Sequence, residues 1–238
     1  MICKMSFFLV VKSSALWLGL AVCLESPITK YEAGAAKWED EVAALIQSDS
    51  VEIADSDDIL FLGSSSIRLW KSIKQDMAPW TAVSRGYGGA KFSDLAIYTQ
   101  RLIAAHYPRA IVIFAGNDIS SDTDLKTPEE IVVLVNHITT TIHNQFPNVE
   151  IFFVGITPTS SRWNLWPEIS AANLAIKEYC NSKASTHFIS TARSYLNEQG
   201  MPRDELFEKD RLHQNGEGYA LWSSIIKRDL GNVFQNKQ

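Results

Sequence analysis

Three successive serines, Ser64–Ser66, could do nucleophilic chemistry. They follow the apolar run Ile59–Leu62, which has the length and character of a buried strand, and Gly63 permits a sharp turn. Helical periodicity resumes at Ile67. A serine at such a strand-to-helix junction can attack a carbonyl carbon, but serine is also a good helix N-cap. The block alone leaves both interpretations open.

Two other uses of this turn fit the residues poorly. A phosphate-binding loop ends in Lys followed by Ser or Thr, and no lysine follows these serines. The nucleophile elbow of α/β-hydrolases would need a glycine where the chain has Ile67.

A base for the serine is available near the end of the chain, at Asp210-Arg211-Leu212-His213. The other four histidines lie in predicted helices or at the edge of a strand, whereas His213 lies in a polar loop. Because positions i and i+3 of a turn lie on the same side, Asp210 can accept a hydrogen bond from one ring nitrogen of His213. The other nitrogen is then free to take a serine proton. A metal site would need a further ligand, and no third Asp, Glu or His stands at a suitable spacing, so we expect no metal.

Two further strand ends carry residues that could bind an anion. Glycines in Gly86-Tyr87-Gly88-Gly89 let backbone N–H groups approach a ligand without interference from Cβ atoms, although a flexible turn is an equally good interpretation. No third glycine completes the dinucleotide fingerprint there. Asn117, in Ala115-Gly116-Asn117-Asp118, could present its amide to an anion or close a turn.

The elements that must position these residues alternate regularly. Apolar runs that read as strands lie at Ile59–Leu62, Ala82–Ser84, Ala110–Ala115, Glu150–Val154 and His187–Ile189. Helical periodicity covers Tyr31–Gln47, Ser93–His106, Pro128–Phe146, Glu168–Ala184 and Glu217–Leu230. Strands that alternate with helices predict about five parallel strands covered on both faces, a three-layer α/β/α sandwich. Such sheets bind ligands at the carboxyl ends of their strands, where the candidate residues lie.

The four blocks, Phe61–Ser66, Gly86–Gly89, Ala115–Asp118 and Asp210–His213, together resemble the SGNH (GDSL-type) hydrolases, an esterase and lipase family. The form Gly-Ser-Ser-Ser-Ile-Arg-x-Trp is similar to one subgroup. The resemblance implies a flavodoxin-like fold for a single domain over residues 24–238. It also implies an ester hydrolase that needs no cofactor and acts on a small-molecule ester.

The resemblance further implies a role for each block. Ser65 becomes the nucleophile, His213 the general base and then acid, and Asp210 the residue that orients His213. The backbone N–H groups of Ser65 and Gly89, with the Asn117 side chain, become the oxyanion hole.

Two positions depart from the usual motifs of the family. Ser64 stands where Gly-Asp-Ser has its acid, and Ala115 stands where the asparagine block begins with glycine. The loop after the fourth strand contains Arg162, Trp163 and Trp166. It could line the acyl or alcohol pocket, or it could pack against the last helix.

The first two dozen residues have the composition of an export signal. Lys4 precedes a mostly apolar stretch that Lys12 interrupts, and no acid occurs before Glu25. We expect a signal peptide over residues 1–23 that is cleaved, because the uninterrupted apolar run is too short to span a bilayer. Cys23, in Leu20-Ala21-Val22-Cys23, is an alternative site of lipid attachment. Cleavage would leave Cys180 as the single cysteine, most simply a buried helix residue.

The bulk composition excludes some classes of function. Hydrophobic residues make up 46% of the 238 residues and charged residues 21%, which is typical of a globular domain rather than a disordered chain. The formal net charge is -5 and no basic run occurs, so we expect no nucleic-acid partner.

Three functions remain on the sequence alone. The first is hydrolysis of short-chain or small acyl esters through an acyl-enzyme at Ser65. A narrower version is a carbohydrate esterase that deacetylates glycans, for which tryptophans in the Arg162 loop would suit sugar stacking. The third is a catalytically silent module that binds a glycan or acyl chain.

Overall fold

A computed structural model describes residues 27–49, 58–120 and 125–235 of the chain. Its centre is a sheet of five parallel strands: β1 (Ile59–Gly63), β2 (Ala82–Gly86), β3 (Ala110–Phe114), β4 (Glu150–Val154) and β5 (Thr186–Ile189). The strand order is β2-β1-β3-β4-β5. This is the flavodoxin-like order, and it places the carboxyl ends of β1, β2 and β3 side by side. The predicted fold class is confirmed.

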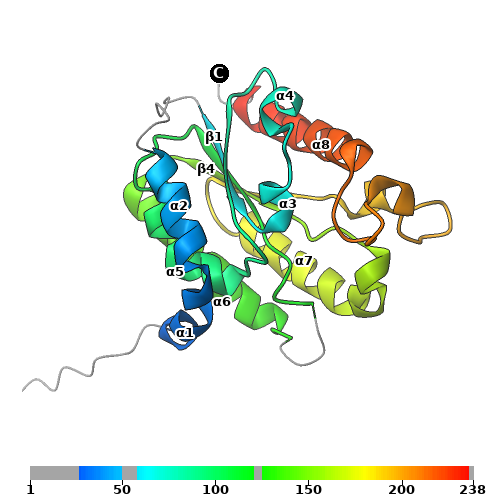
Figure 1. Ribbon diagram of the computed structural model, residues 1–238, viewed down its shortest axis with the longest axis horizontal. Helices are drawn as coiled ribbons and strands as arrows, with labels where there is room; N and C mark the ends of the chain where they lie inside the picture. Colours follow the sequence, from blue (N-terminus) through cyan, green and yellow to red (C-terminus); the bar gives the residue numbers. More distant parts are fainter. Residues whose placement is uncertain (1–26, 50–57, 121–124, 236–238) are drawn as a thin grey trace, which may run out of the picture.

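Helices cover both faces of the sheet (Figure 1). The helices on one face are α1 (Glu32–Ala35), α2 (Glu39–Asp49), α5 (Phe92–Ile103), α6 (Pro128–Gln145) and α7 (Trp166–Asn181). Those on the other face are α3 (Ser65–Arg68), α4 (Ile73–Asp76) and α8 (Gly216–Gln235). Short 3-10 turns lie at Thr29–Tyr31, Ala36–Trp38, Ser160–Leu165, Ala192–Tyr195 and Asp204–Leu206.

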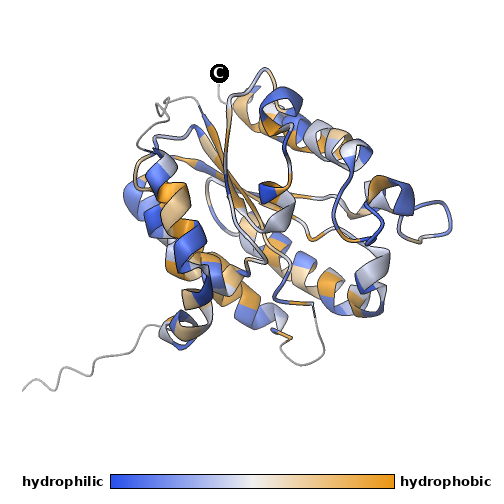
Figure 2. Ribbon diagram, viewed as in Figure 1, coloured by the Kyte–Doolittle hydropathy of each residue, from blue (hydrophilic) through white to orange (hydrophobic). Residues whose placement is uncertain are grey.

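Side chains on the two faces of each strand pack into two separate hydrophobic cores. Ile59 and Phe61 of β1 pack toward α8, whereas Leu60 and Leu62 pack toward α5. This alternation follows from the period of two in a strand, and it explains why a doubly covered strand is apolar throughout. Figure 2 shows the hydrophobic stripes of the helices turned toward the sheet.

The first helical segment differs in detail from the predicted single helix Tyr31–Gln47. The helical path is present, but it tightens into a 3-10 turn at Ala36–Trp38 between α1 and α2. At this turn the Trp38 ring packs directly against Gly88.

The predicted signal peptide and Cys23 lie outside the described residues. Of the helices that the structure describes, none is long and apolar enough to cross a membrane.

Candidate active site

Ser65 is the first residue of α3, immediately beyond the end of β1. The turn that exposes it depends on a close backbone approach, because the Ser64 N–H donates to the Phe114 carbonyl oxygen at 3.1 Å. A Cβ on Gly63 would lie 2.1 Å from that same oxygen, so only glycine fits there. The Tyr219 hydroxyl donates to the Ser66 carbonyl at 2.9 Å and thereby ties the turn to α8.

The structure brings Ser65, His213 and Asp210 together. The Ser65 hydroxyl lies 3.0 Å from Nε2 of His213, and Nδ1 of His213 lies 2.7 Å from Oδ2 of Asp210. Ser65 and His213 are 148 positions apart in the sequence, whereas Asp210 and His213 are only three apart. The chain of hydrogen bonds has the geometry of a nucleophile, a base and a group that orients the base.

The loop that carries His213 is bent so that one carboxylate serves three donors. Oδ1 of Asp210 accepts the backbone N–H groups of Leu212 at 2.9 Å and His213 at 3.0 Å, while Oδ2 faces the ring. Arg211 makes this bend with a φ of 54°, a conformation that is uncommon for residues other than glycine. Partial burial opposes ionisation of Asp210, but these hydrogen bonds outweigh it and hold the pKa of its carboxyl below the ordinary 3.8.

Asn117 and Gly89 approach each other on the opposite side of Ser65. A Cβ on Gly89 would lie 3.8 Å from Nδ2 of Asn117. That amide nitrogen donates one hydrogen to the Ala90 carbonyl at 3.0 Å, so its second hydrogen is available to a ligand. A neighbouring carboxylate holds this region in place: Asp118 is completely buried and accepts from the Phe92 N–H at the start of α5, at 2.5 Å.

Arg162 contacts this group of residues from the loop after β4. Its Nη2 donates to Oδ1 of Asn117 at 2.7 Å, and its Nη1 donates to the Gly116 carbonyl at 3.2 Å. Among the described residues no carboxylate lies within ion-pair distance of Arg162, and burial lowers the pKa of its guanidinium. The cation therefore faces the site without a counter-ion.

Two residues of the N-terminal helices brace the glycine loop, and sequence reasoning did not find them. The Glu41 carboxylate accepts the Gly88 N–H at 2.9 Å. The Trp38 ring fills the space where a Gly88 side chain would be, since a Cβ there would lie 2.0 Å from Cζ3. Trp38 is itself fixed by a 3.1 Å hydrogen bond to Asp94. No local motif marks Trp38 or Glu41, because their contacts bridge about fifty residues of chain.

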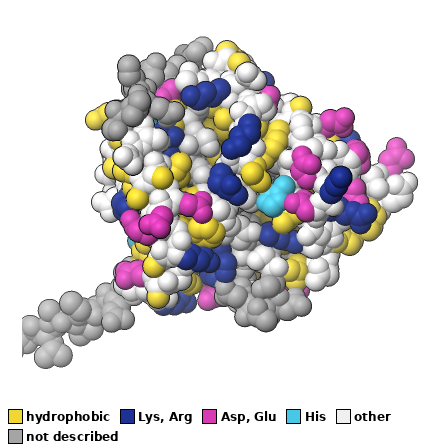
Figure 3. Space-filling view, in the orientation of Figure 1, with side chains coloured by type: hydrophobic (Ala, Val, Ile, Leu, Met, Phe, Trp, Pro, Cys, Tyr) yellow, Lys and Arg dark blue, Asp and Glu magenta, His cyan; other side chains and the backbone are white. Residues whose placement is uncertain are grey.

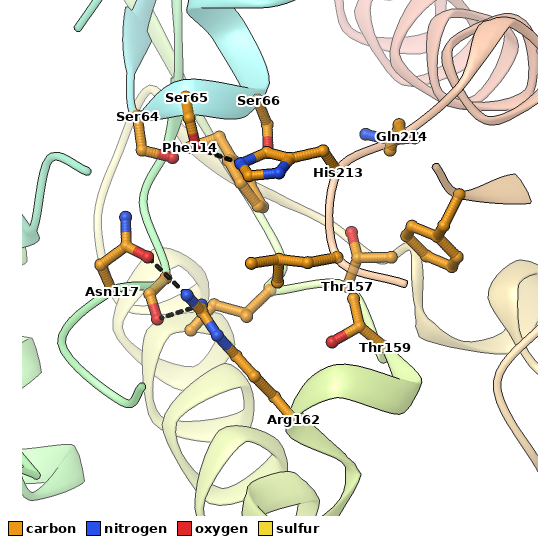
Figure 4. A pocket seen from close by; sticks show the side chains of 14 residues that line it. Ser64, Ser65, Ser66, Phe114, Asn117, Thr157, Thr159, Arg162, His213 and Gln214 are labelled. Atoms are coloured by element: carbon orange, nitrogen blue, oxygen red, sulfur yellow. Dashed lines mark hydrogen bonds between the residues drawn. The ribbon is translucent and has the colours of Figure 1, made fainter. Parts of the chain in front are cut away.

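A pocket opens beside Ser65 and His213, with Asn117 at one side and Arg162 along its floor (Figure 4). Its other lining residues are Ser64, Ser66, Phe114, Gly116, Ile156, Thr157, Thr159, Phe207, Leu212 and Gln214. The cavity volume is about 40 Å³. One water needs about 10–15 Å³ on this scale, so the cavity has room for about three waters. Figure 3 shows a histidine side chain open to solvent on this face of the molecule, and the His213 side chain is 28% exposed.

The tryptophans of the same loop do not line this pocket. Trp163 and Trp166 stack on each other, with ring centroids 5.7 Å apart and planes 14° apart. Trp166 packs against the core on the α5 side of the sheet, not against α8. Of the three residues predicted to bind substrate, only Arg162 lies at the pocket.

The arrangement can support acyl transfer. It offers a hydroxyl with a base, and N–H donors on the far side where a tetrahedral oxyanion would form. Within the described residues no three His, Cys, Asp or Glu side chains are grouped so that they could hold a metal ion.

Comparisons with known proteins agree with this geometry. A family model described as the GDSL-like lipase/acylhydrolase family matches residues 62–221. No curated protein sequence matches the chain.

Solved structures share the fold at low identity. A protein from Streptococcus pneumonia, provisionally described as a platelet activating factor, is 19% identical with a TM-score of 0.68, over 85% of this chain and 97% of that one. A GDSL-like lipase from Bacteroides thetaiotaomicron is 18% identical with a TM-score of 0.64, over 84% and 98%. An acetylxylan esterase from Geobacillus stearothermophilus is 15% identical with a TM-score of 0.60, over 75% and 96%.

Proposed function

Because the chain belongs to the GDSL-like lipase/acylhydrolase family and is a carboxylic ester hydrolase, we propose that it hydrolyses small acyl esters through an acyl-enzyme at Ser65. The observation that carries this proposal is the hydrogen-bonded row Ser65–His213–Asp210, with contacts of 3.0 and 2.7 Å. A serine hydroxyl is a weak nucleophile, and a base at this distance is what activates it.

In the first half-reaction, Oγ of Ser65 attacks the ester carbonyl carbon while its proton passes to Nε2 of His213. The carbonyl oxygen becomes an oxyanion, which the N–H groups of Ser65, Gly89 and Asn117 stabilise. Each such donor typically lowers the barrier by about 3 kcal/mol. The bond to the alcohol oxygen then breaks, the alcohol takes the proton from His213, and the acyl group remains on Ser65.

In the second half-reaction, water attacks the Ser65 ester and gives its proton to His213. Collapse of the second oxyanion releases the carboxylic acid and returns the proton to Ser65. Throughout both halves Asp210 holds the imidazole in the tautomer that leaves Nε2 free to accept.

The test is the activity of Ser65→Ala on a chromogenic short-chain ester, together with labelling by a fluorophosphonate. We expect wild type to turn over the ester and to carry the label on Ser65, and Ser65→Ala to do neither. Ser224→Ala, which removes an exposed hydroxyl on α8, should behave as wild type. Labelling of Ser65→Ala at the wild-type rate, or wild type without any label, would contradict the acyl-enzyme.

A carbohydrate esterase is the second candidate. The cavity has about the volume of an acetyl group, and the similar solved structures include an acetylxylan esterase. Acetate release from acetylated glycans, compared with fatty-acid release from lipid esters, distinguishes this candidate from a lipase.

We also propose export of the chain, with residues 1–23 removed and residues 24–238 as a single domain. The support is the basic, then apolar, acid-free composition of the first 24 residues. The mass of the N-terminal peptide in the mature protein tests it. That mass distinguishes simple cleavage from lipid attachment at Cys23.

A further inference from the structure

The pocket contains two hydroxyl groups that the fold leaves without hydrogen bonds. The side chains of Thr157 and Thr159 line it from the segment after β4, and each residue is only 6% exposed. Neither Oγ1 atom has a partner within the part of the chain that the structure describes. Buried hydroxyls without partners are costly, which makes a pair of them beside one cavity a feature that a ligand would explain.

Arg162 adds unused donors to the same cavity. A guanidinium carries five N–H groups, and the hydrogen bonds of Arg162 to Gly116 and Asn117 use two of them. Figure 4 shows Arg162 along the floor of the pocket, with Thr157 and Thr159 across it from Asn117. The cavity thus combines groups that only donate with groups that both donate and accept.

The volume of the cavity decides which half of an ester it can hold. Room for about three waters suits an acyl group of two or three carbons. The alcohol half must leave before water can attack the acyl-enzyme, so it belongs on the side where His213 is open to solvent. The cavity beside Thr157, Thr159 and Arg162 is therefore the acyl side.

We propose that Thr157, Thr159 and Arg162 form a subsite for a short acyl group that carries a hydroxyl, such as hydroxyacetyl. This deepens the proposed function and rests on it. A substrate hydroxyl could donate to a threonine oxygen and accept from Arg162, whereas an alkyl group of the same size leaves the two threonine hydroxyls without a partner. Sites of this kind discriminate strongly against the analogue that lacks the hydrogen-bonding group.

Two acyl groups of equal size provide the test. Hydroxyacetyl and propionyl esters of one chromogenic alcohol differ only in a terminal OH or CH₃. Each kcat/KM is divided by the rate constant for hydroxide-catalysed hydrolysis of the same ester, which removes the difference in intrinsic reactivity. We expect a corrected preference of at least about tenfold for hydroxyacetyl.

Isosteric variants locate the preference. Thr157→Val and Thr159→Val keep the shape and remove the hydroxyl, so each should lower the corrected preference several-fold, mainly by raising turnover of the propionyl ester. Thr139→Val removes a hydroxyl that is also buried, in α6 outside the pocket, and should leave the preference unchanged.

The outcomes separate this subsite from the proposed function. Turnover of both esters without a corrected preference, or a preference that survives both valine variants, overturns the subsite and leaves the acyl-enzyme standing. Failure of wild type to hydrolyse any ester overturns the acyl-enzyme and the subsite together.

Discussion

Nη2 of Arg162 donates to Oδ1 of Asn117 at 2.7 Å, and this contact decides which end of the amide faces the site. With the oxygen held by Arg162, the amide nitrogen is turned toward Gly89 and Ala90. The opposite orientation would present an oxygen, not a donor, to an oxyanion. Arg162 is therefore a positioning residue for Asn117.

The first prediction concerns this contact. Lysine has no planar fork and cannot reproduce both bonds of Arg162, so Arg162→Lys should lower kcat/KM for an acetyl ester about tenfold. In an Asn117→Ala background the same change should cost much less, because the group that it orients is gone. Steady-state kinetics of the four proteins measure this coupling. Additive effects would show that Arg162 does not act through Asn117.

The second prediction concerns the brace on the glycine loop. Glu41→Ala removes the acceptor of the Gly88 N–H. It should lower kcat several-fold with little change in KM, since the role that we propose for the neighbouring Gly89 N–H is in the transition state. Glu41→Gln keeps an acceptor oxygen and should restore most of the rate. Glu39 lies on the same helix as Glu41 and makes an exposed ion pair with Arg101 of α5, so Glu39→Ala is the control. A KM effect alone would assign Glu41 to substrate binding.

The third prediction concerns pH. Because the pKa of Asp210 is lowered in the folded protein, its carboxylate stabilises the fold at pH values above the unfolded pKa. That contribution is lost as the pH falls through the lower, folded value. The Tm difference between wild type and Asp210→Asn should therefore shrink as the pH falls below about 4. At pH 7, kcat of the variant should be lower by about 10³-fold, because the imidazole loses the group that fixes its tautomer. A Tm difference that grows on acidification would show that folding raises the pKa of Asp210 instead of lowering it.

The fourth prediction concerns stability away from the site. Asp49 at the end of α2 binds Arg85 of β2 through Nε at 2.7 Å, and both side chains are 4% exposed. Asp49→Ala should lower the free energy of unfolding by at least about 2 kcal/mol, because a buried cation loses a carboxylate partner. Glu39→Ala, at a pair whose side chains are 50% and 44% exposed, should cost much less than Asp49→Ala. Urea denaturation of both variants measures the contrast.

The sequence predicted the fold well because doubly covered strands are apolar along their whole length. The runs at 59–62 and 150–154 needed no tertiary information, and both are strands. Helix ends were less accurate: α7 begins at Trp166, not Glu168, and α8 continues to Gln235, not Leu230. Pro167 fits the first turn of a helix, so it permits the earlier start.

The structure brings Ser65, Asp210 and His213 together, and the sequence pointed to them through the four blocks in order, since the serine block alone left two interpretations open. The contacts of Arg162 with Asn117 and of Glu41 with Gly88 could not be found in this way. They join segments whose proximity depends on how helices and loops pack over the sheet. No sequence motif around either residue indicates which residue it contacts. Trp163 and Trp166 show the reverse case, since their composition suited sugar stacking but they pack against each other.

The separation of Ser65 from its base by 148 positions also has a consequence for biosynthesis. The serine turn needs only β1 and β3, whereas His213 lies beyond β5, just before the start of α8. During synthesis Ser65 is therefore made well before His213, and the contact between them cannot form until the chain has been made through residue 213. The hydrolysis that we propose for this site has to wait for that contact, so a chain released before residue 213 would fold part of the sheet without becoming an esterase.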